Sequence, residues 1–278
     1  MTELINYNFM TRPASHCVDS SEEFYNSCGV SRGNKNGFSI ETLKDGDVIF
    51  VKTDFIHNGT FQKQILPQIK TKFILVTGVS SFSVDEGDSS YLDILNHPNL
   101  VKWFCTNPPI KPNEKIVWLP IGFEERERDG GNVKILNNFY KSHTPWDKKE
   151  NKIYIPHHSN TFKDRNSIIE KLSLESYVVT EPTRLSFEEY LKNMDKYKFV
   201  LSLRGAGWDC HRHYECLLVG SVPIMEKGPI QKSFESNGLP NLEIGEISQN
   251  IFDDHYNFLS SNNFLTMDHH FNKINNIK

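Results

Sequence analysis

Short apolar runs rich in β-branched and aromatic residues alternate along this chain with polar stretches that can form helices. Strands separated by helices, rather than by tight turns, predict a parallel sheet with helices on its faces. The predicted strands cover residues 47–55, 72–77, 101–105, 115–119, 152–156, 177–180, 198–203 and 222–225. The predicted helices cover residues 61–70, 91–95, 162–172, 186–196, 209–219 and the tail from 247 to 258 and beyond. The chain is therefore predicted to belong to the α/β class.

A charged stretch separates the two series of strands. Residues 124–150 contain the run EERERDGGN and end in Thr144-Pro145-Trp146. We interpret the run as a solvated face and the stretch as a domain boundary, because boundaries fall in polar segments that contain Pro and Gly. The prediction is two Rossmann-like β/α domains, 1–145 and 146–278, with a cleft between them. The first ~35 residues show no clear period and are interpreted as an irregular arm or short helix.

The composition restricts location and partners. The 278 residues carry a net charge of −4, which gives the whole protein no attraction to nucleic-acid phosphates. No apolar run approaches the roughly 20 residues that span a bilayer, and no signal-peptide pattern opens the chain. The five cysteines are an odd number and are expected to be reduced thiols. We therefore expect a cytoplasmic protein with no membrane span and no nucleic-acid partner.

Residues 198–227, KFVLSLRGAGWDCHRHYECLLVGSVPIMEK, carry the clearest chemical signal. They predict a strand, a glycine-containing turn, and a helix with Asp209 as N-cap and Gly220 as C′. Glycines let backbone N–H groups approach phosphate oxygens, and a helix N-terminus favours negative charge. The segment therefore predicts an anion site.

Two arginines and a glutamate make this prediction more specific. Arg204 ends the strand, and Arg212 lies in the first helical turn, where a cation is unfavourable unless an anion binds there. Glu215 lies three residues after Arg212 and four after His211, so the three share one side of the helix. Its carboxylate suits the hydroxyls of a ribose. The alternative is an Arg212–Glu215 surface pair of little energetic consequence.

The same segment contains residue types that bind metals, but their spacing does not suit one ion. Cys210, His211, His213 and Cys216 fall on different faces of the predicted helix, so no metal site is expected. The dinucleotide fingerprint is also absent, because position 210 is a cysteine. The missing fingerprint and the paired arginines, which suit a diphosphate leaving group, disfavour a dehydrogenase, a methyltransferase or another nucleotide-cofactor enzyme.

The run FVLSLRGAGWDCHRHYECLLVGSVPIM resembles the C-terminal signature of the exostosin-like glycosyltransferases. That signature is a strand, Arg-Gly, a short polar turn, Arg-x-x-Glu, a Gly and a Pro-containing strand. The matching positions are Arg204, Gly205, Asp209, Arg212, Glu215, Gly220 and Pro223. Upstream, LVKWFCTNP and WLPIGFE resemble further segments of the short soluble viral and bacterial members.

This resemblance implies a GT-B-like architecture in which the C-terminal domain holds most of the donor. It implies inverting, metal-independent transfer from a UDP-sugar to a hydroxyl of an oligosaccharide or glycoprotein, with no further cofactor. Arg204 and Arg212 would then face the diphosphate and Glu215 the ribose. The other residues assigned to the donor are Gly205, Gly207, Trp208, Asp209, His211, Asn160, Arg165 and His158. UDP-xylose is the favoured donor, because a short chain suggests a small pocket.

Inversion also needs a general base for the acceptor hydroxyl. The candidates are Asp54 and His57 after the first strand and Asp85 in the loop after the second, of which Asp85 is favoured. The alternative function is a non-catalytic nucleotide- or sugar-binding module of the same fold.

Overall fold

The computed structural model describes residues 4–5, 16–18, 40–84, 91–124, 128–253, 256, 258 and 263–277. The chain forms two compact units. Unit 1 comprises Met1–Ile121, Gly207–Asp209 and Thr266–Lys278, and unit 2 comprises Gly122–Ala206 and Cys210–Leu265. The sequence predicts two domains, 1–145 and 146–278. These ranges remain a prediction of which parts of the chain fold independently.

Unit 1 contains a five-stranded parallel sheet whose spatial order follows the chain. Its strands are β1 (His16–Val18), β2 (Asp47–Lys52), β3 (Phe73–Gly78), β4 (Leu100–Cys105) and β5 (Ile116–Trp118). All six residues of β3 are buried, as expected for a parallel strand covered on both faces. Each new strand is added at the same edge, so the described strands of this sheet never reverse their order.

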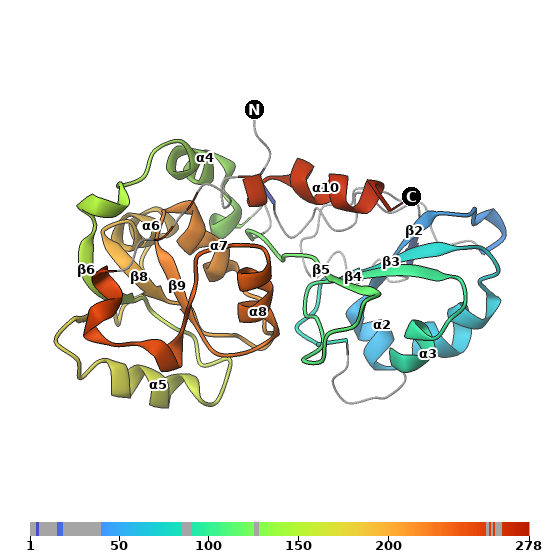
Figure 1. Ribbon diagram of the computed structural model, residues 1–278, viewed down its shortest axis with the longest axis horizontal. Helices are drawn as coiled ribbons and strands as arrows, with labels where there is room; N and C mark the ends of the chain where they lie inside the picture. Colours follow the sequence, from blue (N-terminus) through green and yellow to red (C-terminus); the bar gives the residue numbers. More distant parts are fainter. Residues whose placement is uncertain are drawn as a thin grey trace. The chain divides into compact units, whose positions relative to one another are not determined.

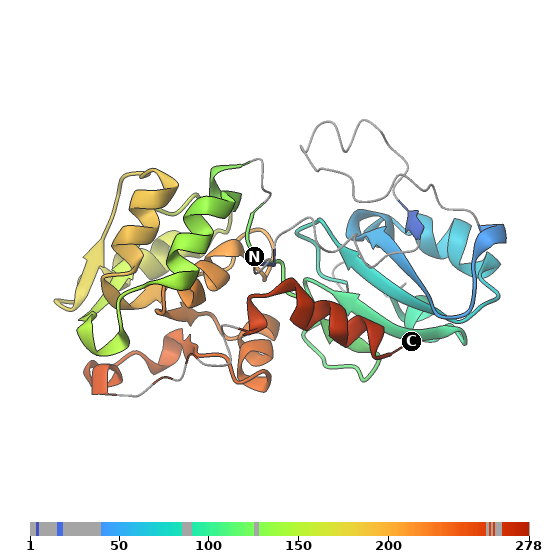
Figure 2. The same cartoon turned by 90° about the horizontal axis from the view of Figure 1, so that it is seen from above.

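The helical segments of unit 1 are short. They are Ile40–Thr42, α2 (Thr53–His57), Phe61–Ile65, Leu66–Gln68, α3 (Tyr91–Leu95) and α10 (Met267–Asn275). The helix predicted over 61–70 is divided into a π turn and a 3₁₀ turn. Pro67 lies at this division, and a proline lacks the N–H that a continuous α-helix would use. Helix α10, red in Figure 2, lies alongside the strands of unit 1 although it ends the chain.

Unit 2 contains a second five-stranded parallel sheet, and its order reverses once. Its strands are β6 (Glu150–Ile155), β7 (Val178–Thr180), β8 (Tyr197–Leu201), β9 (Val222–Met225) and β10 (Leu242–Glu243). The spatial order is β10-β9-β8-β6-β7. The chain thus adds β7 on one side of β6 and then returns to add β8 on the other side. The gap between β6 and β8 is the topological switch point of an open α/β sheet.

Helices cover both faces of this second sheet (Figure 1). They are α4 (Val133–Lys141), α5 (Arg165–Leu172), α6 (Phe187–Met194), α7 (His211–Leu218) and α8 (Pro229–Ser236), with 3₁₀ turns at Asp129–Gly131, Trp146–Lys148, Ile244–Glu246 and Gln249–Asp253. Ile168 and Leu172 of α5 pack on one face, against a core that includes Ile153. In Figure 1, α6 and α7 lie on the opposite side from α5. The connection from β7 to β8 runs back past β6, which places its helix on that opposite face.

The predicted α/β class with two Rossmann-like domains is confirmed. All eight predicted strands are present; the strand at 222–225 has the predicted ends, and the ends of the others are shifted by up to three residues. The largest shift is at 47–55, where β2 ends at Lys52 and α2 begins at Thr53. Sequence reasoning missed α4 and α8, and it assigned no strand to His16–Val18. In the predicted helical tail from residue 247 onward, the structure describes a 3₁₀ turn at Gln249–Asp253 and the helix α10.

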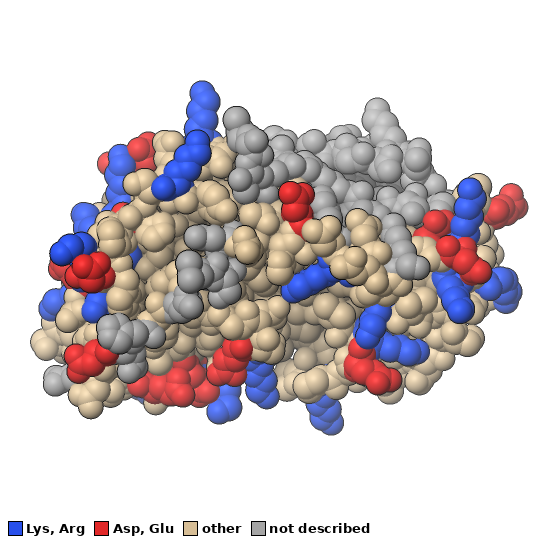
Figure 3. Space-filling view, turned by 45° about the horizontal axis from the view of Figure 1, so that its top comes forward, with Lys and Arg blue, Asp and Glu red and all other residues tan. Residues whose placement is uncertain are grey.

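Lys, Arg, Asp and Glu side chains are interspersed on the face that Figure 3 shows. That face therefore presents no large patch of one charge. Among the described residues, no helix has both the length and the apolar character required to cross a bilayer.

Candidate functional site

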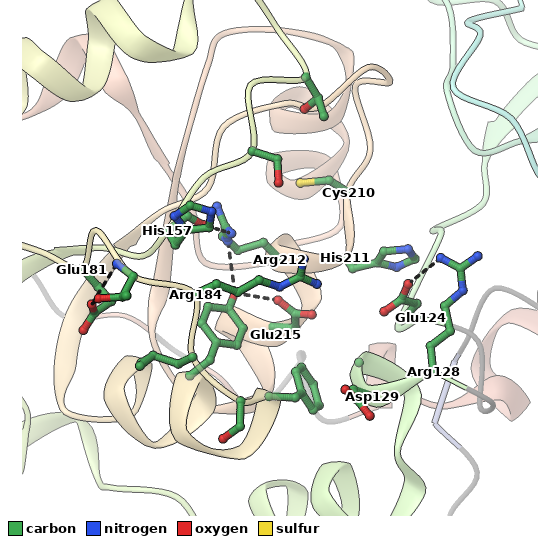
Figure 4. Close-up of a pocket in the computed structure, with 18 of the residues that line it drawn as sticks. Glu124, Arg128, Asp129, His157, Glu181, Arg184, Cys210, His211, Arg212 and Glu215 are labelled. Atoms are coloured by element: carbon green, nitrogen blue, oxygen red, sulfur yellow. Dashed lines mark hydrogen bonds and ion pairs between the residues drawn. The ribbon is translucent and has the colours of Figure 1, made fainter.

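A polar pocket of about 730 Å³ opens in unit 2 at the carboxyl ends of β6 and β8 (Figure 4). This is the switch point of the sheet, where open α/β folds bind their ligands. The volume lies within the range of about 300–1,000 Å³ that is usual for small-molecule sites. The lining residues are Glu124, Arg128, Asp129, Gly130, Tyr154, His157, Ser159, Thr161, Arg165, Glu181, Thr183, Arg184, Leu185, Ser186, Phe187, Tyr190, Cys210, His211, Arg212 and Glu215.

Helix α7 begins one residue later than predicted. Its N-cap is Cys210, whose side chain makes no capping hydrogen bond. Asp209 is not the N-cap, because its carboxylate is bonded within unit 1, where Oδ2 accepts from Trp118 Nε1 at 3.2 Å and from Ile121 N at 2.9 Å. The predicted C′ glycine is confirmed: Gly220 follows the C-cap and has φ +66°. The start of α7, free of a side-chain cap, faces the pocket through Cys210, His211 and Arg212.

Arg212 and Glu215 are linked through the hydroxyl of Tyr190, which comes from α6. Arg212 Nε donates to this hydroxyl at 3.1 Å, and the hydroxyl donates to Glu215 Oε2 at 2.7 Å. Arg212 also donates from Nη2 to the carbonyl oxygen of His157 at 3.0 Å. Figure 4 shows Arg212 and Glu215 of α7 close to His157 of the loop after β6. The linked cation, hydroxyl and carboxylate make a wall that can both donate to and accept from a ligand.

Burial governs the ionisation of this wall. It raises the pKa of the Glu215 carboxyl, and the Tyr190 hydrogen bond and the charge of Arg212 oppose that rise. The pKa of the Tyr190 hydroxyl is raised well above its ordinary value, first by burial and then by the neighbouring Glu215. Tyr190 therefore stays protonated and donates a hydrogen bond to Glu215.

Arg165 lines the pocket and also holds its two main loops together. The side chain is only 7% exposed. Its guanidinium donates to the carbonyl oxygens of Arg204 at 2.7 Å, Ser159 at 2.8 Å and Leu203 at 3.0 Å. Ser159 follows β6, and Leu203 and Arg204 follow β8. Arg165 thus fixes the loops on either side of the switch point with its charge close to the pocket.

His158 lies beside this cationic region and is neutral. Burial, and then the positive charges of Arg212 and Arg165, lower the pKa of His158 to about 2. Its Nδ1 donates to the carbonyl oxygen of Pro156. That tautomer leaves Nε2 as an acceptor, and Nε2 is buried without a hydrogen-bond partner in the described part of the chain.

Of the residues that the sequence assigned to the donor, four line the pocket: Arg165, His211, Arg212 and Glu215. His211 Nδ1 donates to the carbonyl oxygen of Gly122 at 2.7 Å, which fixes its ring at the pocket edge. The residues assigned to the donor that are not part of the lining are His158, Asn160, Arg204, Gly205, Gly207, Trp208 and Asp209.

Arg204 and Gly207, which do not line the pocket, contact other protein groups instead. The guanidinium of Arg204 lies over the ring of Phe162, 4.7 Å from its centroid, and donates to the Ala206 carbonyl oxygen. Gly207 belongs to unit 1, where a Cβ would lie 3.1 Å from both the Asn107 amide and the Ser81 carbonyl oxygen. A side chain at 207 would therefore be crowded, so this glycine serves close packing against protein groups. Gly205 has ordinary space for a Cβ, with its nearest neighbour 3.6 Å away.

Two candidate bases, Asp54 and His57, lie in unit 1 directly after β2. Asp54 is in α2 and forms an ion pair with Lys52, with Nζ and Oδ2 3.3 Å apart. The ring of His57 stacks on Phe82 with 4.0 Å between centroids. Asp85, the favoured base, lies outside the described residues, so the choice of base stays a prediction.

Sequence reasoning missed several residues of the pocket. Glu124, Arg128 and Asp129 belong to the charge run that was interpreted as a solvated face, yet all three line the pocket. Arg128 and Glu124 form an ion pair at 3.1 Å. Tyr190 and Arg184 had no local signal, because only the packing of α6 and its preceding loop brings them to the site. Within the described part of the chain, no group of three or more His, Cys, Asp or Glu side chains could hold a metal ion.

Comparison with known proteins gives little further information. The sequence matches no protein-family model, and no curated protein matches it. Among solved structures, the fold is similar to one described as "Crystal Structure of alpha1,3-Fucosyltransferase". The TM-score is 0.37 at 13% identity, over 94% of this chain and 79% of that chain.

Proposed function

We propose that this protein is a glycosyltransferase whose unit 2 binds the nucleotide part of a sugar donor in the polar pocket. The observation that carries the proposal is the Arg212–Tyr190–Glu215 wall at the switch point of a parallel sheet. Open α/β sheets bind nucleotides at this position, with phosphates at the N-terminus of the following helix.

The charges of the wall suit a nucleoside diphosphate. Arg212 lies in the first turn of α7, where its charge is favourable when an anion is bound there. Arg165 adds a second positive charge at the pocket. The carboxylate of Glu215 can accept hydrogen bonds from ribose hydroxyls. In the transfer step, negative charge grows on the leaving diphosphate, so Arg212 would stabilise the transition state more than the bound donor.

The finer details belong to the proposal as well. We assign the donor as a UDP-sugar, with UDP-xylose as the first candidate, and the acceptor as a glycan hydroxyl. Transfer is inverting and independent of a bound metal, with a general base from Asp85, Asp54 or His57. Transfer that persists in EDTA, with the β-linked product expected of inversion at an α-linked donor, supports these assignments.

The first experiment is binding. Thermal unfolding is followed with UDP, GDP, NAD and S-adenosylmethionine, and UDP is expected to raise the transition temperature. Titration calorimetry then compares Arg212→Ala with Lys192→Ala, a control that removes an exposed cation paired with Glu188 on α6. Loss of a hydrogen-bonded charge costs about 1.5–3 kcal/mol, so Arg212→Ala should weaken UDP binding about 10- to 100-fold. Lys192→Ala should bind as the wild type does. The absence of any UDP response refutes the proposal.

The second experiment separates an enzyme from a binding module. Release of UDP is measured over a panel of UDP-sugars and one GDP-sugar, with and without oligosaccharide acceptors. Arg212→Ala is expected to raise the donor KM and to lower kcat. UDP binding without acceptor-dependent release of UDP would favour the non-catalytic module.

A further inference from the structure

Three side chains of unit 2 line up in the order cysteine, imidazole and hydroxyl. The Cys210 sulfur lies 3.3 Å from His213 Nε2, and His213 Nδ1 lies 2.7 Å from the Ser202 hydroxyl oxygen. Cys210 and His213 are three residues apart at the start of α7, so they share one side of the helix. A nucleophile within reach of a base, which is itself oriented by a third group, is the arrangement that activates a thiol.

The imidazole is held in place and protected from solvent. His213 is 1% exposed, and its ring packs edge-on against Phe234. When His213 takes the proton of Cys210, both ring nitrogens become donors, one to the thiolate and one to the Ser202 oxygen. The Ser202 hydroxyl can donate in turn, because it is also hydrogen bonded to Cys216. The thiolate–imidazolium pair is thus hydrogen bonded at both ring nitrogens. Before transfer the thiol can also donate to the Leu203 carbonyl oxygen, 3.6 Å away, so the S–H turns from that oxygen to His213.

The thiol lies on the wall of the polar pocket in a positive environment. Cys210 is partly exposed and is the N-cap of α7, where the helix dipole favours a negative charge. Arg165 and Arg212 both interact electrostatically with it. Glu226, beyond β9, interacts with Arg165 and offsets part of that charge. Helix N-termini and neighbouring arginines are the surroundings that make cysteines reactive.

We propose that Cys210 is a nucleophilic thiol on the pocket wall and a site of covalent modification by small disulfides. The Cys210 proton passes to His213 Nε2, and the thiolate sulfur attacks one sulfur of the disulfide. A new S–S bond to Cys210 forms as the original S–S bond breaks. The other half leaves as a thiolate, which takes the proton from His213. Cys210 is oxidised to a mixed disulfide, and the disulfide is reduced to one thiol.

Other cysteines provide an internal comparison. Cys105 and Cys216 are buried, and burial raises the pKa of the Cys216 thiol well above its ordinary value. These two thiols are expected to stay unmodified in the folded protein. Among the three cysteines whose side chains the structure describes, modification is therefore expected at Cys210.

The test is the rate of modification by glutathione disulfide, followed at each cysteine by peptide mass mapping between about pH 5.5 and pH 9. A free cysteine is about 1% thiolate at pH 6.5. Each tenfold gain in thiolate is offset about threefold by lower nucleophilicity. Cys210 is therefore expected to react several-fold faster than free cysteine at pH 6.5. In His213→Asn this advantage should disappear at pH 6.5, and the rates should approach those of the wild type near pH 9. The control His157→Asn changes another pocket histidine and should keep the fast rate.

Two results would overturn the assignment. One is a wild-type rate profile that follows free cysteine, with a midpoint near pH 8.5, the usual value for a thiol. The other is a folded His213→Asn variant that reacts as fast as wild type at pH 6.5. If His213→Asn does not fold, the wild-type profile alone decides.

The same samples with UDP separate this inference from the proposed function. Slower modification in UDP supports a shared pocket. Fast modification that UDP does not slow leaves the thiol assignment intact and contradicts UDP binding at this pocket.

Discussion

Tyr190→Phe tests whether the hydroxyl between Arg212 and Glu215 organises the pocket. The substitution keeps the ring and removes one oxygen, which accepts from Arg212 at 3.1 Å and donates to Glu215 at 2.7 Å. A hydrogen bond to a charged group contributes about 1.5–3 kcal/mol when buried. Tyr190 and Arg212 are only partly buried, so water in the pocket replaces part of this, and we expect a total loss of about 2 kcal/mol.

Two measurements check this magnitude. A loss of about 2 kcal/mol lowers the thermal transition of a unit of this size by about 4–8 °C. UDP binding should weaken about tenfold, because Arg212 and Glu215 lose their common anchor. The matched control is Tyr177→Phe, which removes a hydroxyl that has no hydrogen bond within the described residues and whose ring packs on Phe252. It should change neither quantity.

A double-mutant cycle makes the test stricter. If the hydroxyl acts through Glu215, Tyr190→Phe and Glu215→Gln should show a coupling energy of about 0.5–3 kcal/mol. Additive effects, or a Tyr190→Phe variant as stable and as tightly bound to UDP as the Tyr177→Phe control, would refute the reasoning.

Three further outcomes follow from single residues. Gly220→Ala should lower the unfolding free energy by about 2–4 kcal/mol in urea titrations, because a Cβ there would lie 2.6 Å from the His143 ring. Gly238→Ala has the same positive φ with open space and should lose only about 1–2 kcal/mol. Because burial raises the folded-state pKa of Glu215, its contribution to stability is greatest below the ordinary value of 4.5 and is lost as pH rises through the raised pKa. Glu215→Gln should therefore flatten the fall in unfolding free energy above that pH, and equal slopes would contradict the assignment. Asp85→Asn should abolish transfer and leave UDP affinity intact, whereas unchanged turnover would move the base to one of the other two candidates.

Much of the fold follows from the sequence because its strands are contiguous and strongly apolar. The run FILVTG is buried at every position, so its strand could be recognised without knowing its neighbours. The segment after β8 was also informative, since Arg212 and Glu215 share a helical side by spacing alone. The order of the strands in unit 2 could not be read in this way, because it depends on which edge of β6 each later strand joins.

Sequence-based predictions about the site were wrong where the position of a residue depends on distant parts of the chain. Asp209 has a good N-cap sequence context, but its carboxylate bonds residues 88 and 91 positions earlier in the chain, so Cys210 caps the helix instead. Arg204 and Arg212 look equivalent in sequence. The ring of Phe162 holds the Arg204 guanidinium in a cation–π contact, and only Arg212 lines the pocket. Tyr190 could not be predicted, because its role comes from the packing of α6 beside α7.

The division of the chain into units has a consequence for biosynthesis. Most of unit 1, Met1–Ile121, precedes unit 2 in the sequence, yet unit 1 also contains Gly207–Asp209 and Thr266–Lys278. Asp209 accepts hydrogen bonds from Trp118 and from the backbone of Ile121, at the end of the first stretch. On the ribosome, residues 1–121 therefore lack part of the packing of unit 1 until the whole of unit 2 has been translated. Unit 2 ends at Leu265, so all of its residues have been made before Thr266–Lys278, the final segment that unit 1 needs.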